Sequence, residues 1–148
     1  MGNMLEIGAR VLAEQPFSRL LGAELVEFTP TTAVLCVPIR AELKQQHGFV
    51  HGGVVSYLAD NALTYAGGAA LGTAVVTSEY KINYVRPAIG EALIARASVV
   101  HAGRTQAVCR CDVYVSADGE EKLCATALGT IARLGQAADG ARELEREG

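Results

Sequence analysis

Hydrophobic side chains recur with the spacing of a helix in two parts of the chain. The longer pattern covers 53–70, where the residues are apolar or small on nearly every side. A helix of this composition is expected inside a core, buried nearly all round. The shorter pattern predicts an N-terminal helix that Asn3 caps and Pro16 stops. Its apolar face consists of Met4, Leu5, Ile7, Val11 and Leu12.

Alternation of apolar and polar positions predicts six strands. Two of them precede the long helix and form a hairpin, at 22–30 and 31–40, with Pro38 at a strand end or edge. The other four follow the helix, at about 74–85, 91–102, 105–116 and 122–133. Turn-forming residues separate these four, at 86–90, 102–104 and 118–119.

The order of elements is therefore helix, two strands, one long helix and four strands. A parallel doubly wound sheet needs alternating strands and helices, which this chain lacks. We predict an α+β fold in which one curved antiparallel sheet of about six strands wraps around the long helix, with a short N-terminal helix. Residues 1–134 would form this single domain, with 1–19 as its N-terminal helical segment and 135–148 as a charged tail. The uncovered edges and outer face of such a sheet favour self-association.

Composition excludes several classes of protein. The 148 residues suffice for one domain, and 50% hydrophobic with 20% charged residues is typical of a folded globular chain. A net charge of −3 without a basic block argues against a nucleic-acid surface. No apolar run approaches the ~18 residues of a membrane span, and 1–15 does not read as a signal peptide. We expect a cytoplasmic protein that binds neither nucleic acid nor membrane.

The cysteines lie within apolar alternating runs and form no CxxC pair. Together with three scattered histidines they give no metal-ligand pattern, so we expect no metal site. We interpret them as buried, reduced thiols: Cys36, Cys109, Cys111 and Cys124.

Asp60 is the only charged residue in 48–77 and falls in the middle of the long helix. A buried carboxylate without a partner is costly or changes its pKa, so something must compensate it. One explanation is structural, with the carboxylate capping a segment or meeting an arginine such as Arg86. The other is that Asp60 is a reacting group of an active site. On the helix, Asp60 shares a face with Ser56, Tyr57, Leu63 and Thr64.

His51-Gly52-Gly53 stands at the start of the same helix. Unpaired N–H groups at a helix N-terminus can stabilise an oxyanion that develops on a carbonyl, although an ordinary loop accounts for these residues equally well. Asp60 lies roughly 12 Å further along the helix by its rise. If both groups serve one site, a second subunit is expected to supply one of them.

Three motifs can now be read together: Gln45-x-x-Gly48-x-x-His51-Gly52-Gly53 with Asp60 nine positions after the histidine, Asn83-Tyr84-Val85-Arg86-Pro87, and Gly103-Arg104. Together they resemble the hotdog-fold acyl-CoA thioesterases, most closely the phenylacetate-degradation (PaaI-like) type. The likeness spans about 20–133 and implies the helix and sheet predicted above, dimers usually paired into tetramers, and active sites between subunits.

The resemblance implies hydrolysis of small or aromatic acyl-CoA thioesters to the free acid and CoA, without any cofactor beyond the CoA of the substrate. Asp60 would act as nucleophile or general base. The Gly52 N–H would polarise the thioester carbonyl, and His51 would orient the site or the leaving thiolate.

Three further residues match positions that assist catalysis in the family. Gln45 falls where many relatives have Asn, at the position that holds the carbonyl or the lytic water. Thr64 and Thr77 both match hydroxyls that orient the water or the acid, and the sequence leaves the choice between them open.

Coenzyme A carries phosphates, so cations are expected near the mouth of the pocket. The candidate CoA-binding residues are Lys81, Arg86, Pro87, Gly103 and Arg104. The small residues at 66–70 would either open space for the acyl group or let the helix pack closely on the sheet.

Two other functions stay open. One is a hotdog dehydratase or hydratase acting on acyl thioesters, although such enzymes usually pair their histidine with an acid placed differently. The other is a non-catalytic acyl-CoA sensor, which would be expected to carry an effector domain for which 148 residues leave no room.

Overall fold

The structure is a computed structural model that describes residues 2–135. The predicted charged tail therefore lies outside the described residues, apart from Gly135. The elements in chain order are α1 (Met4–Ala13), α2 (Pro16–Leu21), β1 (Glu24–Phe28), β2 (Thr32–Pro38), the 3-10 turn η1 (Ala41–Leu43), α3 (Gly52–Leu71), β3 (Val75–Tyr84), β4 (Ala92–Ala102), β5 (Gln106–Ala117) and β6 (Glu120–Arg133).

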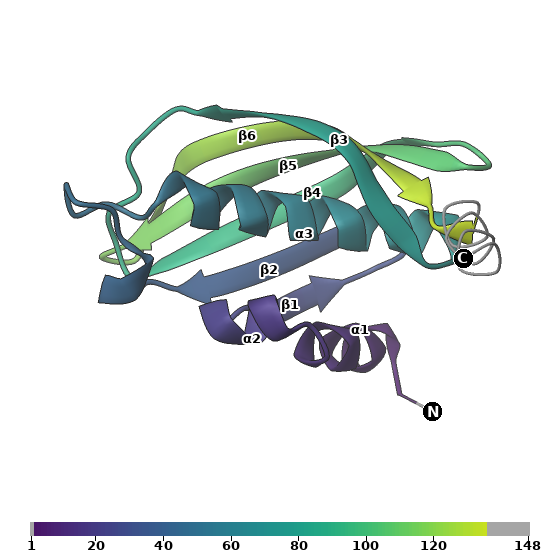
Figure 1. Ribbon diagram of the computed structural model, residues 1–148, viewed down its shortest axis with the longest axis horizontal. Coiled ribbons are helices and arrows are strands. Elements are labelled where there is room, and N and C mark those ends of the chain that lie inside the picture. The colour runs from purple at the N-terminus through teal and green to yellow at the C-terminus, as the bar shows by residue number, and fades with distance from the viewer. Residues whose placement is uncertain (1, 136–148) are drawn as a thin grey trace, which may run out of the picture.

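All six strands form one antiparallel sheet in the order β1-β2-β4-β5-β6-β3. The sheet curves around α3 (Figure 1). The helix α3 lies on the inner face of the sheet and connects β2 to β3, and β1 and β3 are the two edges. This arrangement confirms the predicted fold class, a single long helix wrapped by a six-stranded sheet with a short N-terminal helix.

Small side chains bring α3 close to the inner face of the sheet. Ala95, Ala107 and Cys109 are fully buried on the central strands. On the helix, a Cβ added at Gly67 would lie 2.6 Å from Cβ of Ile131 on β6. Of the two explanations for the small residues at 66–70, close packing therefore accounts for Gly67.

The N-terminal segment contains two helices where the sequence predicts one. Asn3 caps α1 as expected, with its side-chain oxygen accepting from the Glu6 N–H over 2.9 Å. Pro16 ends the first pattern, but it also starts α2 at the position where the missing N–H of proline costs nothing. The first helix, α1, lies beside β1, and α2 leads into that strand (Figure 1).

The expectation that α3 is buried nearly all round is wrong for one face. Asp60, Ser56, Asn61 and Thr64 are half-buried, whereas the opposite face from Val54 to Leu71 is buried against the sheet. Asp60 therefore remains within reach of solvent. None of the helices in the described range is long and apolar enough to cross a membrane.

Candidate active site

A hydroxyl from β3 holds the carboxylate of Asp60. Thr77 Oγ1 donates to Asp60 Oδ1 over 2.5 Å. Thr64, one turn further along α3, donates to the backbone carbonyl of Asp60 over 2.8 Å and lies 3.0 Å from Thr77 Oγ1. Within 2–135, no group of the chain donates to the second carboxylate oxygen, Asp60 Oδ2. The sequence did not distinguish these two hydroxyls. In the structure, Thr77 contacts the carboxylate of Asp60, and Thr64 contacts the Asp60 backbone carbonyl and Thr77.

A β-bulge turns Thr77 toward α3. The pairing of β3 with β6 shifts its register between Thr77 and Glu79. Beyond the shift, the hydroxyl of Tyr80 lies 2.5 Å from that of Ser56 on α3. In a regular strand, residues 77 and 80 would point to opposite faces of the sheet. The extra residue, Ser78, lets both side chains face the helix.

The N-terminus of α3 is capped by His51 and covered by Tyr84. His51 Nδ1 accepts a hydrogen bond from the Gly53 N–H over 2.8 Å, which assigns the proton of the neutral imidazole to Nε2. Tyr84 Oη donates to the carbonyl of Gly52 over 3.1 Å. The Gly52 N–H meets no acceptor within the described range, so it remains a free donor at the positive end of the helix.

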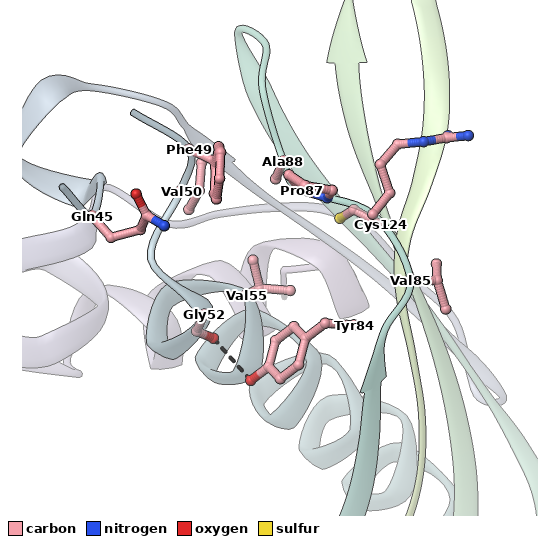
Figure 2. A pocket seen from close by; sticks show the side chains of 11 residues that line it. Gln45, Phe49, Val50, Gly52, Val55, Tyr84, Val85, Pro87, Ala88 and Cys124 are labelled. Carbon is pink, nitrogen blue, oxygen red and sulfur yellow. Dashed lines mark hydrogen bonds between the residues drawn. The ribbon is translucent and has the colours of Figure 1, made fainter. Parts of the chain in front are cut away.

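A cavity of about 320 Å³, called here the N-terminal cavity, opens at this helix end. The side-chain oxygen of Gln45 accepts from the His47 N–H, and Figure 2 shows the nitrogen of Gln45 turned toward the other lining residues. Gly52, whose N–H is free, and Gln45, whose side-chain nitrogen is turned inward, therefore line one space. The lining residues are Gln45, Phe49, Val50, Gly52, Val55, Tyr84, Val85, Arg86, Pro87, Ala88 and Cys124.

Asp60 does not line the N-terminal cavity. The helix runs without interruption from Gly52 through Asp60, so the separation of roughly 12 Å expected from helical rise is retained. Arg86, the arginine considered as a structural partner for Asp60, lies at this cavity instead. The Gly52 N–H and the carboxylate of Asp60 in one chain thus occupy separate places along α3.

The expected CoA-binding residues are divided in the same way. Arg86 and Pro87 line the N-terminal cavity beside Gly52. Lys81 alternates with the inward-facing Tyr80 and lies on the outer face of the sheet, in a small hollow shared with Arg110.

Gly103 and Arg104 form the exposed turn between β4 and β5. The Gly103 N–H donates to Gln106 O over 2.8 Å. Since Gln106 pairs with Ala132, and Ala132 pairs with Val76 near the start of β3, this turn lies at the end of the sheet away from Arg86. Within one chain, Arg104 and Arg86 therefore lie at opposite ends of the sheet.

Sequence reasoning missed two features of the site. Tyr84 belongs to a motif that carries the family resemblance, but the sequence did not predict its hydrogen bond to Gly52 O. The contact of Tyr80 with Ser56 depends on the bulge, which shifts the simple alternation of the strand. The available signal was the spacing of four residues between Tyr80 and Tyr84, which places both side chains on the same face of a strand.

A six-stranded antiparallel sheet curved around one helix, with a free N–H donor at the helix start and a carboxylate held at its middle, defines the hotdog class of thioester-processing proteins. Comparison with known sequences agrees. A sequence model of the Thioesterase superfamily matches residues 47–122, about half of the chain. The chain belongs to the thioesterase superfamily, and it is a thioester hydrolase.

Individual relatives give the same result. The acyl-coenzyme A thioesterase PaaI of Escherichia coli K12 is 29% identical over 119 residues, covering 80% of this chain and 82% of that protein. The crystal structure of a thioesterase family protein from Silicibacter pomeroyi is 40% identical, with a TM-score of 0.80 over 83% of this chain and 92% of that one. The structure of E. coli PaaI is 25% identical, with a TM-score of 0.77 over 86% of this chain and 91% of that one.

Proposed function

We propose that the protein hydrolyses small or aromatic acyl-CoA thioesters to the free acid and CoA. The observation that carries the proposal is the carboxylate of Asp60, which Thr77 orients from one side while Asp60 Oδ2 stays free. A carboxylate held in this way on a half-exposed helix face is suited to act on a bound ester or on a water beside it. The name of the E. coli relative, an acyl-coenzyme A thioesterase, supports CoA as the thiol.

In the proposed reaction, Asp60 acts as general base or as nucleophile. By the first route, it takes a proton from water, the hydroxide adds to the thioester carbon, and the negative charge moves to the carbonyl oxygen. The Gly52 N–H and the Gln45 side-chain nitrogen stabilise that oxyanion. The carbon–sulfur bond then breaks, and the proton on Asp60 passes to the CoA thiolate. We assign His51, which carries its proton on Nε2, to the leaving thiolate.

The donors and the acid come together when two copies of the chain associate. Ser56 is the midpoint between Gly52 and Asp60 on α3. A twofold axis that crosses an antiparallel pair of α3 helices near Ser56 places Gly52 of each copy beside Asp60 of the other. The half-buried face of α3 and the unpaired outer edge of β3 are the surfaces available for this association. We propose a homodimer, paired further into a homotetramer.

The same association would bring together the CoA-binding residues that lie apart within one chain. Arg86 and Pro87 would hold CoA beside the donors of one copy. The turn with Gly103 and Arg104, together with Lys81, would reach the CoA phosphates from another copy, because these residues lie away from the N-terminal cavity of their own chain.

The test is a thiol-release assay across a panel of acyl-CoA esters with wild type, Asp60→Asn and Asp60→Ala. Both variants should lose activity by about 10²- to 10⁴-fold, the usual size of a general-base contribution. Asp112→Asn is the matched control, since Asp112 is a half-buried carboxylate that accepts from Thr126 on β6. Turnover of no ester by wild type, or full rates in both Asp60 variants, would refute the proposal. Tight CoA-ester binding without turnover would support a sensor instead.

A further inference from the structure

A second and larger cavity lies between α1 and the C-terminal half of α3. Its volume is about 580 Å³, within the usual range of small-molecule sites. We call it the α1–α3 cavity. Most of its lining is apolar, and it comes from both helices, from Phe28 at the end of β1, and from the link between α3 and β3. The lining residues are Met4, Ile7, Gly8, Val11, Gln15, Phe28, Asn61, Thr64, Tyr65, Gly68, Ala69, Gly72, Thr73, Ala74 and Val75.

This cavity begins one helical turn from Asp60, at Thr64. Thr64 lines the cavity, donates to Asp60 O and lies 3.0 Å from Thr77 Oγ1. Thr64 follows Asp60 by one helical turn, roughly 6 Å along the axis. An acyl group whose carbonyl carbon is within reach of Asp60 therefore has this apolar space directly beside it.

The wall formed by α1 is fixed in place by tight contacts. Tyr65 Oη, which is buried, donates to Gly8 O over 2.8 Å. Gly8 lets α1 approach β1, because a Cβ there would lie 2.6 Å from Leu25 Cδ2 and 2.8 Å from Phe28 Cδ2. The ring of Phe28 meets that of Tyr65 edge to face at 5.2 Å. These contacts therefore fix the position of the cavity wall that α1 forms.

The apolar side chains of that wall are left uncovered. Ile7 is 50% exposed and Val11 is 47% exposed, and both line the cavity. An apolar occupant would remove this surface from water, which is favourable in proportion to the area buried.

A hydrogen-bonded network closes one end of the cavity. Asn61 Nδ2 donates to Gln15 Oε1 over 3.1 Å and to Tyr57 Oη over 3.1 Å, and Ser18 Oγ donates to Gln15 Oε1 over 2.6 Å. Gln15 and Asn61 line the cavity. Within 2–135, the network uses Gln15 Oε1 and Asn61 Nδ2 but neither Gln15 Nε2 nor Asn61 Oδ1. A long hydrocarbon chain that reached these two atoms would bury them without a partner, which is unfavourable. This end wall therefore limits the length of an apolar occupant.

We propose that the α1–α3 cavity receives the acyl group of the thioester, so that the N-terminal helix α1 sets which acyl groups are hydrolysed. The occupant is a ring-sized or medium-chain apolar acyl group. The inference rests on the proposed function, since it takes Asp60 as the group beside the thioester carbon. It adds a specificity role for Ile7 and Val11, which lie outside the helix-and-sheet unit.

The test fills the cavity from each side and compares substrates of different bulk. Val11→Trp fills it from α1, and its control is Leu5→Trp, at a partly exposed residue of the same helix outside the lining. Ala69→Leu fills it from α3, and its control is the neighbouring, half-buried Ala70→Leu. Each filling variant should lower kcat/KM for octanoyl-CoA by at least about tenfold, because the octanoyl chain loses its apolar site. Acetyl-CoA, which does not reach the cavity, should stay within about twofold of its wild-type kcat/KM. Equal losses for both esters, or none in either filling variant, would overturn the inference.

A binding measurement separates this inference from the proposed function. The thioethers S-octyl-CoA and S-ethyl-CoA cannot be hydrolysed, so calorimetric titration reports the acyl site whether or not the chain turns over. Wild type should bind S-octyl-CoA more tightly than S-ethyl-CoA, and Val11→Trp should remove the difference. If wild type hydrolyses no ester yet shows this preference and loses it in the variant, the cavity stands and the hydrolytic proposal falls. If wild type hydrolyses esters but the variant keeps the preference, only the cavity falls.

Discussion

Thr77 on β3 donates a hydrogen bond to the carboxylate of Asp60 on α3 over 2.5 Å, and the two residues meet because a bulge at Ser78 turns Thr77 toward the helix. The bond occupies Oδ1 of the acid and leaves Oδ2 for a water or a thioester carbon. It joins the edge strand of the sheet to the middle of the central helix. This bond therefore fixes the position of β3 relative to α3 at the proposed reacting group.

Replacing Thr77 by valine should reduce catalysis while leaving substrate binding nearly unchanged. Valine keeps the shape of threonine but donates no hydrogen bond, so the Asp60 carboxylate loses its fixed orientation. We expect kcat to fall by about tenfold or more, at the scale of one charge-assisted hydrogen bond, with KM within about threefold. Thr77→Ser should restore most of the rate. A Thr77→Val enzyme with wild-type kcat would show that the bond is structural only.

The N–H of Gly52 can be removed with little disturbance of the helix. Gly52 is the first residue of α3, where proline is well tolerated, and His51 has φ −58° and ψ 134°, the backbone that precedes proline. Gly52→Pro should therefore fold normally and lose about 10²- to 10³-fold in kcat, as for other oxyanion donors. Gly52→Ala is the control that keeps the N–H, and its Cβ would make ordinary contacts with the Tyr84 ring at 3.5 Å. Equal rates in the two variants would remove Gly52 from the mechanism.

Mixing two inactive variants tests whether each site draws on two chains. Asp60→Ala lacks the acid and Gly52→Pro lacks the donor, so either homodimer should be inactive. In a hybrid dimer, one of the two sites regains both groups. Refolding an equal mixture should recover about a quarter of wild-type activity, since half of the dimers are hybrids with one intact site each. Recovery of no activity would mean that Gly52 and Asp60 of one chain serve the same site.

Much of the fold followed from periodicity. The apolar pattern at 53–70 predicted α3, which spans Gly52–Leu71, because a helix buried on its sheet-facing side leaves a clear signal. The second N-terminal helix, α2, was missed since Pro16 is a stop signal for the first helix and equally a start signal for another.

The site was less accessible to sequence reasoning. Its residues could be named from spacing and resemblance, and Gln45, Gly52, Arg86 and Pro87 do line one cavity. The sequence could not show which of Thr64 and Thr77 contacts the Asp60 carboxylate, because that contact depends on a bulge that inserts one residue into β3 without any glycine or proline to mark it. The α1–α3 cavity was equally hidden, since it depends on where α1 packs.

Close packing of α3 on β6 predicts a stability effect at Gly67. Gly67→Ala places a methyl group 2.6 Å from Ile131 Cβ, so side chains or backbone must shift. We expect the free energy of unfolding to fall by about 1–3 kcal/mol, the usual cost of overpacking. The neighbouring Gly68→Ala is the control, with its nearest contact at 3.2 Å from a side-chain methyl of Val75 and with the helix preference of alanine in its favour. Urea unfolding of both variants measures the difference, and a Gly67→Ala protein as stable as Gly68→Ala would contradict the packing argument.

The buried cysteines predict how stability changes with alkaline pH. Burial raises the pKa of Cys109 and Cys124 to about 11 and that of Cys111 to about 12. The unfolded chain releases these protons from about pH 8.5 upward, while the folded chain still holds them. Unfolding therefore becomes more favourable as the pH rises from about 8.5 toward 11 to 12, and the contribution of the three thiols to stability is complete only below that window.

Urea unfolding at pH 8 and pH 10 should show this loss of stability. The loss should shrink in a variant with alanine at all three positions, compared at the same two pH values so that the cost of the empty space cancels. A thiol reagent at pH 8 supplies a second measurement. Because a pKa of 11 leaves only about one thiol in a thousand ionised at pH 8, the three should react only after unfolding. Fast reaction of Cys109, Cys111 or Cys124 in the native protein would contradict their burial.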